Sequence, residues 1–289
     1  MKTKNFFRRK TTGQIIVYVI AFVVMLVQCL SLIFCLLWGF SSSLKTQEEF
    51  SLNSPLAFPQ QWVFANYAEA FGMLEVRGFN FFGLICNSIW YAVGTPLIQI
   101  TVSMIIAYVV IKYPSKFTKV YHAYVLVMMM INLSAGSAAT YRFFAKLNLV
   151  DSPLFLVGKI GKTTFAYLIF CAAWRGVAND YMEAAKIDGA NHWTIMFRVM
   201  IPQVIGTWGA LFIMDFITWW NDYTSPMIYF PNWPTLATGL FEYESDMIMS
   251  VNMPVYFAGL MISMVPVIVL FMIFQDTIMD RISIGGIKG

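Results

Sequence analysis

The stretch EAAKIDGAN (residues 183–191) is a short polar insert in a very apolar chain. Of the 289 residues, 59% are hydrophobic and only 12% are charged, and the mean hydropathy is +0.67. The stretch nevertheless holds two acids, a Lys and a Gly, and it lies between the apolar segments TFAYLIFCAAW (164–174) and GALFIMDFITWW (209–220). Globular proteins rarely exceed about 45–50% apolar residues, so the composition excludes an ordinary soluble domain.

Long windows without a charged residue indicate a membrane protein. Four such windows are residues 11–44, 78–111, 120–141 and 247–275. Each is long enough for a spanning helix, which needs about 20 apolar residues. Two weaker spans contain charges: residues 153–173, with Lys159 and Lys162, and residues 204–220, with Asp215. The sequence therefore predicts an all-α, polytopic protein with six transmembrane helices.

The charges of the loops predict which side of the membrane each loop faces. Lys and Arg favour the cytoplasmic side, and they gather in the leader KTKNFFRRK (2–10) and in the connection 112–119. The apolar run after the leader is too long for a cleavable signal peptide, so it is expected to stay as an anchor. The connection between the fifth and sixth spans carries acids and no Lys or Arg. Both termini and EAAKIDGAN are therefore predicted to be cytoplasmic, although the basic loop 142–162 opposes this orientation.

The residues around EAAKIDGAN predict a short helix that ends in a glycine turn. Asp180 is a suitable N-cap, and Glu183 stands three positions later as the reciprocal partner of a capping box. Gly189 follows the last helical residue, at a position where a left-handed backbone favours Gly. The short helix is thus expected over residues 181–188.

A second helix is expected over residues 192–200. Asn191 is its N-cap, and the helix should stop before Pro202. Its apolar residues stand at helical spacing and are expected to form one face; they are Trp193, Met196, Phe197 and Met200.

Two interpretations of this unit remain open on physical grounds. A two-turn helix is unstable alone, so a partner protein could dock on it. Ala184 and Ala185 would let the partner approach closely, and Tyr181 and Met182 would offer apolar bulk. Alternatively, the unit is a connector that lies on lipid headgroups.

The longer stretch EAAKIDGANHWTIMFRVMIPQ (183–203) resembles the signature of the membrane subunits of binding-protein-dependent ABC importers. It is most similar to their carbohydrate branch, typified by the second membrane subunit of the maltose transporter. The resemblance covers nearly the whole chain. It includes SSLKTQEEF (42–50), WVFANYAEAF (62–71), NSIWYAVGTPL (87–97), WWNDYTSPMIY (219–229) and GGIKG (285–289). The chain departs from the family at Ala178 and Gly206, where proline is usual.

The resemblance implies a type I importer permease fold. Its five-helix core would occupy residues 80–280 and carry a coupling helix at 180–190. Residues 1–79 would add a cytoplasmic N-terminus, the first transmembrane helix and an outer loop, and 281–289 a cytoplasmic tail. The coupling helix would insert into a cytoplasmic ATPase subunit. By resemblance its docking positions would be Glu183, Ala184, Ala185, Asp188 and Gly189. The physical interpretation adds Tyr181 and Met182 to them.

The resemblance also implies partners. They are a second, different permease, two ATPase subunits that bind ATP and Mg, and an extracellular or periplasmic solute-binding protein. The chain itself would bind no cofactor, metal or nucleic acid. It would be a multi-pass protein of the cell (inner, cytoplasmic) membrane.

The candidate contacts with the transported solute lie in the fifth predicted span and at its outer end. Asp215 is an acid well inside the span, about 18 Å along a helix from Gln203, which predicts a position near the middle of the membrane. Such acids usually face the protein interior or a water-filled path. It could hydrogen-bond sugar hydroxyls, or instead contact the partner permease. Trp219, Trp220 and Asn221 could meet a sugar ring, although aromatic residues there more often form an interfacial belt.

The sequence thus predicts a permease subunit of an ATP-driven importer, for a sugar or oligosaccharide. Alternatives are a permease for another solute, or a self-sufficient secondary transporter or channel. Such transporters often show internal repeats, and none is visible here. No arrangement of residues typical of a catalytic site stands out, so the chain is not expected to be an enzyme.

Overall fold

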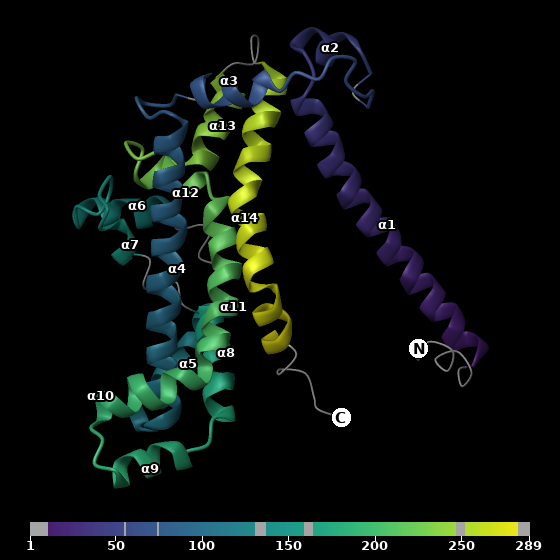
Figure 1. The fold of residues 1–289 in the computed structure, drawn as a ribbon. Helices are drawn as coiled ribbons and strands as arrows, with labels where there is room; N and C mark the ends of the chain where they lie inside the picture. Colours follow the sequence, from purple (N-terminus) through teal and green to yellow (C-terminus); the bar gives the residue numbers. More distant parts are fainter. Residues whose placement is uncertain are drawn as a thin grey trace. The chain divides into compact units, whose positions relative to one another are not determined.

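In this computed structural model the described residues are 11–54, 56–73, 75–130, 137–158, 164–246 and 252–282. They are almost entirely helical, and one isolated bridge joins Val76 to Phe79. The helices before the EAAKIDGAN stretch are α1 (Thr12–Ser43), α2 (Gln47–Leu52), α3 (Ala65–Met73), α4 (Phe81–Lys112), α5 (Lys116–Met130), α6 (Ser137–Lys146), α7 (Phe155–Gly158) and α8 (Thr164–Gly176). Those that follow are α9 (Asp180–Ile187), α10 (His192–Thr194), the π-helix η4 (Ile195–Met200), α11 (Ile201–Trp220), α12 (Thr224–Tyr229), α13 (Leu236–Asp246) and α14 (Met253–Ile282). Figure 1 shows their course.

The chain forms two compact units. The smaller one comprises Met1–Ala70 and Met249–Ile262, and the larger one comprises Phe71–Ile248 and Ser263–Gly289. We call the larger one the core unit. The domain boundaries at residues 79 and 280 stay predictions.

Four described helices are long and apolar enough to cross a membrane, which supports a multi-pass protein. They are Gly13–Ser43, Phe81–Lys112, His192–Trp220 and Met253–Gln275. The predicted count of six is not confirmed. The third predicted span begins inside the 15-residue α5 and then reaches residues 131–136, which lie outside the described ones.

The fourth predicted span does not form one helix from residue 153. Only α8, with 13 residues, is a long helix there, and residues 159–163 lie outside the described ones. Upstream, the Asp151 carboxylate accepts hydrogen bonds from Asn232, and the Ser152 hydroxyl accepts one from the Leu154 N–H. Residues 151–154 therefore form a loop, and the predicted span does not begin as a helix at residue 153.

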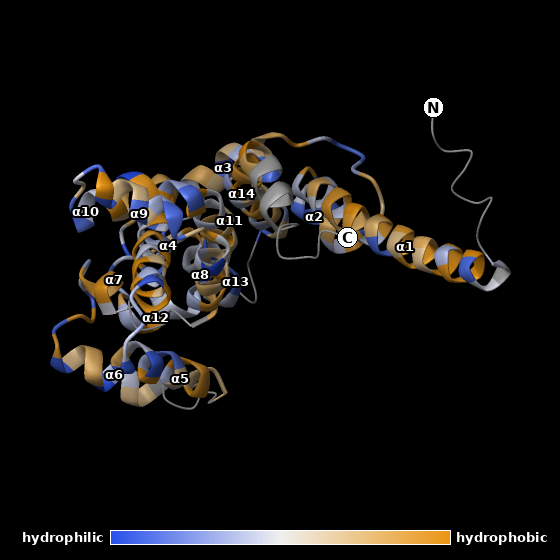
Figure 2. Ribbon diagram, turned by 90° about the horizontal axis from the view of Figure 1, so that it is seen from below, coloured by the Kyte–Doolittle hydropathy of each residue, from blue (hydrophilic) through white to orange (hydrophobic). Residues whose placement is uncertain are grey.

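In the smaller unit, α1 is hydrophobic over most of its length (Figure 2). Its apolar side chains are exposed, as expected for a helix that faces lipid. The end of α1 is held by specific contacts. Trp38 packs edge-on against Phe257 at a ring distance of 5.2 Å, and the Ser43 and Tyr67 hydroxyls are hydrogen-bonded at 2.8 Å. The Asn66 amide donates to the backbone carbonyls of Ser43 and Lys45.

The core unit is organised around α4, α8 and α11, which pack against one another (Figure 1). Buried residues recur on α4 at helical spacing, so one face of this apolar helix is covered by protein. Trp174 of α8 is fully buried there, and its indole N–H donates to the Met104 carbonyl at 3.1 Å. The same core cluster includes residues of α9 and η4, which joins the polar insert to the membrane helices.

The prediction that a helix stops before Pro202 is wrong. The helix that begins at His192 continues through η4 into α11, with 29 residues in all, and Pro202 occupies its first α-helical turn after η4. Proline lacks an N–H and its ring clashes with the carbonyl four residues earlier. The wider π turn before Pro202 accommodates both effects. Gly206 lies inside α11 and does not end it.

The π turn also divides the apolar face that was predicted for residues 192–200. Met196 and Met200 are buried, whereas Trp193 and Phe197 are exposed and stack on each other at 6.0 Å. A π turn holds more residues than an α turn, so side chains expected on one side are shifted around the axis.

Candidate coupling helix and polar cavity

The prediction that Asp180 caps the short polar helix is wrong. The helix α9 has Asn179 as its N-cap, in an α-helical conformation and without a side-chain capping bond. The Asn179 side chain is occupied elsewhere, because the Lys112 ammonium donates to its Oδ1 at 2.8 Å and to the Val177 carbonyl at 2.6 Å. Asp180 therefore stands in the first turn, where its charge is still favourable.

The glycine turn after α9 is confirmed. Gly189 has φ +77°, a conformation in which side chains are strained. The Gly189 N–H donates to the Lys186 carbonyl and the Ala190 N–H donates to the Ala185 carbonyl. This pair of bonds is a Schellman motif, so the turn closes the helix as the sequence indicates.

The second helix begins where predicted. Asn191 is the N-cap of α10, and its Oδ1 accepts a hydrogen bond from the Thr194 N–H at 2.8 Å. Only Ala190 stands between the Gly189 turn and this cap, so α9 is joined to the spanning helix by a short, hydrogen-bonded connection.

The predicted docking residues lie on two different faces of α9. Met182 and Ala185 are 6% and 8% exposed and belong to the core cluster, so this face of α9 packs against the core unit. The exposed positions are Tyr181, Glu183, Ala184, Asp188 and Gly189. Ile187 is 86% exposed and was missed, although it stands in the same polar stretch as the exposed Tyr181, and two large exposed apolar side chains on one short helix are the available signal.

A cavity of about 690 Å³ lies between α4, α8 and α11 and the start of α12. Its lining includes three of the four predicted solute contacts, Asp215, Trp219 and Asn221. Trp220 does not line it, because this side chain is buried and its N–H donates to the Ser263 carbonyl of α14 at 3.0 Å. Asp215 is five residues from the end of a helix that begins at His192, so it lies nearer that end than the middle.

Two lining residues come from α4 and were missed by sequence reasoning. Gln99 and Ser103 are buried polar side chains on the same helix face, four residues apart. With Thr95 they form a polar row in an otherwise apolar window, which is the signal that could have found them. The complete lining is Gln99, Ser103, Phe165, Ala166, Leu211, Met214, Asp215, Thr218, Trp219, Asn221, Asp222, Tyr223, Thr224 and Ser225. This lining combines hydroxyl and amide groups with two carboxylates.

Hydrogen bonds fix the rim of the cavity. The Tyr91 hydroxyl donates to Asp222 at 2.9 Å, and the Ser225 N–H donates to the other oxygen of the same carboxylate at 3.0 Å. The Tyr91 ring also packs edge-on against Trp219 at 5.5 Å. The chain turn after α11 is thus tied to α4.

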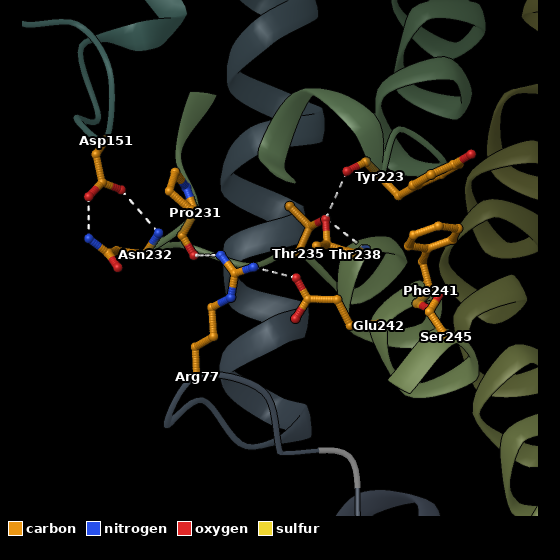
Figure 3. Close-up of polar contacts among 10 residues, drawn as sticks. All are labelled: Arg77, Asp151, Tyr223, Pro231, Asn232, Thr235, Thr238, Phe241, Glu242 and Ser245. Atoms are coloured by element: carbon orange, nitrogen blue, oxygen red, sulfur yellow. Dashed lines mark hydrogen bonds and ion pairs between the residues drawn. The ribbon is translucent and has the colours of Figure 1, made fainter. Parts of the chain in front are cut away.

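A polar network holds the loop that follows α12 at the same end of the core unit (Figure 3). The Arg77 guanidinium donates to the Pro231 carbonyl at 2.5 Å and pairs with Glu242 at 2.6 Å. The Asp151 carboxylate accepts both the backbone N–H and the side-chain amide of Asn232. These contacts connect segments far apart in the sequence, and they give this loop a defined surface.

Comparisons with known proteins agree with this architecture. The family described as "Binding-protein-dependent transport system inner membrane component" matches residues 4–284. The chain is 28% identical over 262 residues to the arabinooligosaccharides transport system permease protein AraQ of Bacillus subtilis (strain 168), covering 89% of this chain and 90% of that one. It is 24% identical over 255 residues to the diacetylchitobiose uptake system permease protein NgcG of Streptomyces coelicolor (strain ATCC BAA-471 / A3(2) / M145), covering 86% and 82%.

A solved structure has the same fold. It belongs to a bacterial ABC transporter involved in the import of the acidic polysaccharide alginate, with a TM-score of 0.75 and 18% identity over 92% of this chain and 98% of that one. Because the family match extends over almost the whole sequence, the chain belongs to the inner membrane components of binding-protein-dependent transport systems.

Proposed function

We propose that this chain is a permease subunit of an ATP-driven importer for a sugar or oligosaccharide. The observation that carries the proposal is the helix α9, which buries one face in the core unit and leaves the other face exposed. The relatives are named for the transport of arabinooligosaccharides and the uptake of diacetylchitobiose, which supports a carbohydrate as the transported solute. The chain would lie in the cytoplasmic membrane with both termini and α9 in the cytoplasm, as the loop charges predict.

The exposed face of α9 would dock on a cytoplasmic ATPase subunit, which binds ATP and Mg. Docking would use Tyr181, Glu183, Ala184, Ile187 and Asp188. Because α9 packs on η4 and η4 continues into α11, a displacement of α9 would be transmitted along this helix to the cavity. The coupling would thus be mechanical, through packed helices.

The cavity would form part of the solute pathway beside a second permease. Sugars present many hydroxyl groups, and the groups on Gln99, Ser103, Asp215 and Asn221 can donate to them or accept from them. The Trp219 ring, which lines the cavity, would contact the apolar face of a sugar. A solute-binding protein would deliver the sugar on the side where the Arg77–Glu242 network lies.

The proposal is tested by purifying the tagged chain from its native membranes in mild detergent. We expect an ATPase and a second permease to co-purify. The solute-binding protein, recovered with the complex by cross-linking, should release a carbohydrate that mass spectrometry identifies. Release of an amino acid or peptide would contradict the sugar assignment alone. Purification of the chain by itself, with uptake after reconstitution that needs no ATPase, would instead establish a self-sufficient transporter.

Replacing the cavity acid tests the solute pathway. Asp215→Leu should lower ATP-dependent uptake of the identified sugar about 3- to 10-fold. A hydrogen bond to a charged group is worth roughly 1.5–3 kcal/mol, and only the part of this energy that is gained when the sugar binds affects uptake. Asp215→Asn should retain most uptake, since an amide also bonds hydroxyl groups. Uptake is measured in proteoliposomes that contain the whole complex.

The matched control is Ile205→Leu, a conservative change at an exposed position of the same helix that does not line the cavity, which should leave uptake unchanged. If Asp215→Leu assembles and transports like the unmodified complex, Asp215 is not part of the pathway.

A further inference from the structure

A second cavity lies where α4 ends, between α5 and α8. Its volume is about 320 Å³, and its lining residues are Val110, Ile111, Pro114, Thr118, Lys119, His122 and Arg175. Two cationic side chains and an imidazole therefore meet at one hollow, from two helices. No acidic residue is among the lining residues. This excess of positive charge is the opposite of the first cavity, whose lining has two carboxylates.

The two cations of this cavity form no ion pair within the part of the chain that the structure describes. The ion pair found there joins Arg77 to Glu242, and neither Lys119 nor Arg175 takes part in one. His122 is oriented by a hydrogen bond of 2.9 Å between its Nδ1 and the Tyr167 hydroxyl. Lys112, nearby in sequence, is engaged with the start of α9 and is not a member of the lining.

The cavity lies at a boundary between apolar and polar surface. Val110 and Ile111 belong to the last turn of the apolar α4, which ends at Lys112. On α5, Phe117 is 78% exposed and Val120 is 69% exposed, as expected for side chains in contact with lipid. Such a boundary is where the phosphate groups of a bilayer lie.

We propose that Lys119, Arg175 and His122 bind a phosphate group at this cavity. An Arg guanidinium matches phosphate with two parallel hydrogen bonds, and a Lys ammonium adds a compact charge. The phosphate is either the headgroup of an anionic phospholipid or free inorganic phosphate. A bound phosphate would link α5 to the last turn of α8, five residues before α9 begins. This inference does not depend on which solute is transported.

Native mass spectrometry of the complete importer tests the proposal. The complex is prepared in nanodiscs of phosphatidylcholine that contain a minor fraction of phosphatidylglycerol, and the phospholipid that stays bound on release is counted. The double variant Lys119→Gln/Arg175→Gln should retain about fivefold less phosphatidylglycerol than the unmodified complex. Binding of radiolabelled inorganic phosphate is measured separately in nanodiscs of phosphatidylcholine alone.

Lys116→Gln is the matched control, since Lys116 is an exposed lysine on the same helix that does not line the cavity. If the double variant loses phosphatidylglycerol and Lys116→Gln does not, the ligand is a lipid headgroup. If the double variant instead loses only the binding of inorganic phosphate, the ligand is free phosphate. If the double variant does not assemble, the single variants Lys119→Gln and Arg175→Gln replace it, and each should lose part of the bound ligand. The proposal is overturned if Lys116→Gln causes an equal loss, or if neither ligand distinguishes the unmodified complex from the cavity variants.

Discussion

Gly189→Val is expected to reduce ATP-driven uptake at least about tenfold while the chain still inserts into the membrane. Gly189 has φ +77° and lies in the turn that closes α9. A β-branched residue is a genuine outlier in this region, and left-handed backbone costs an ordinary residue roughly 1–2 kcal/mol. The turn would therefore change its path and displace α9 from its docking position. Uptake and ATP hydrolysis are measured in proteoliposomes that contain the assembled complex.

Gly176→Val is the matched control for this experiment. At both glycines an added Cβ meets no atom within 4 Å, but only Gly189 has a positive φ. The control should therefore transport nearly as well as the unmodified chain. Gly189→Asn should also retain most activity, because Asn tolerates a left-handed backbone. Equal activity of Gly189→Val and Gly176→Val would show that the glycine turn is not needed for coupling.

Ile187→Asp is expected to weaken retention of the ATPase at least about thirtyfold. Ile187 is 86% exposed in this chain, so the substitution should leave the thermal stability of the isolated permease unchanged. In a docked complex the new carboxylate would be buried without a partner, which costs several kcal/mol, and each 1.4 kcal/mol is a factor of ten. Retention is measured by titrating purified ATPase against the immobilised permease.

Met182→Ala distinguishes the two faces of α9. Met182 is buried against the core unit, so its truncation should lower the melting temperature of the permease and loosen α9, with a smaller loss of ATPase binding. The proposed assignment of faces fails if Ile187→Asp destabilises the isolated permease, or if it binds the ATPase as well as the unmodified chain.

The elements that the sequence predicts correctly are those fixed by local chemistry. Long uncharged windows predict α1 and α4, because a helix satisfies every backbone group in lipid with hydrogen bonds inside a single segment. Gly189 and Asn191 predict a turn and a cap, since each acts on its own neighbours.

The errors come from contacts between distant residues. Lys112 engages the Asn179 side chain, which no pattern near α9 reveals. A π turn before Pro202 lets the helix continue where proline normally ends one. The polar row of Gln99 and Ser103 is visible in the sequence, but no pattern near it reveals that Asp215 of α11 lines the same cavity.

The bonds of Lys112 to the start of α9 have a mechanical consequence. They attach the first turn of α9 to α4, while the last turn of α9 leads through Asn191 into the helix that contains α11. The helices α4 and α11, which both line the polar cavity, are thus connected to opposite ends of α9. A displacement of α9 is therefore expected to pull on α4 as well as on α11, so both of these helices would respond to a partner that moves α9.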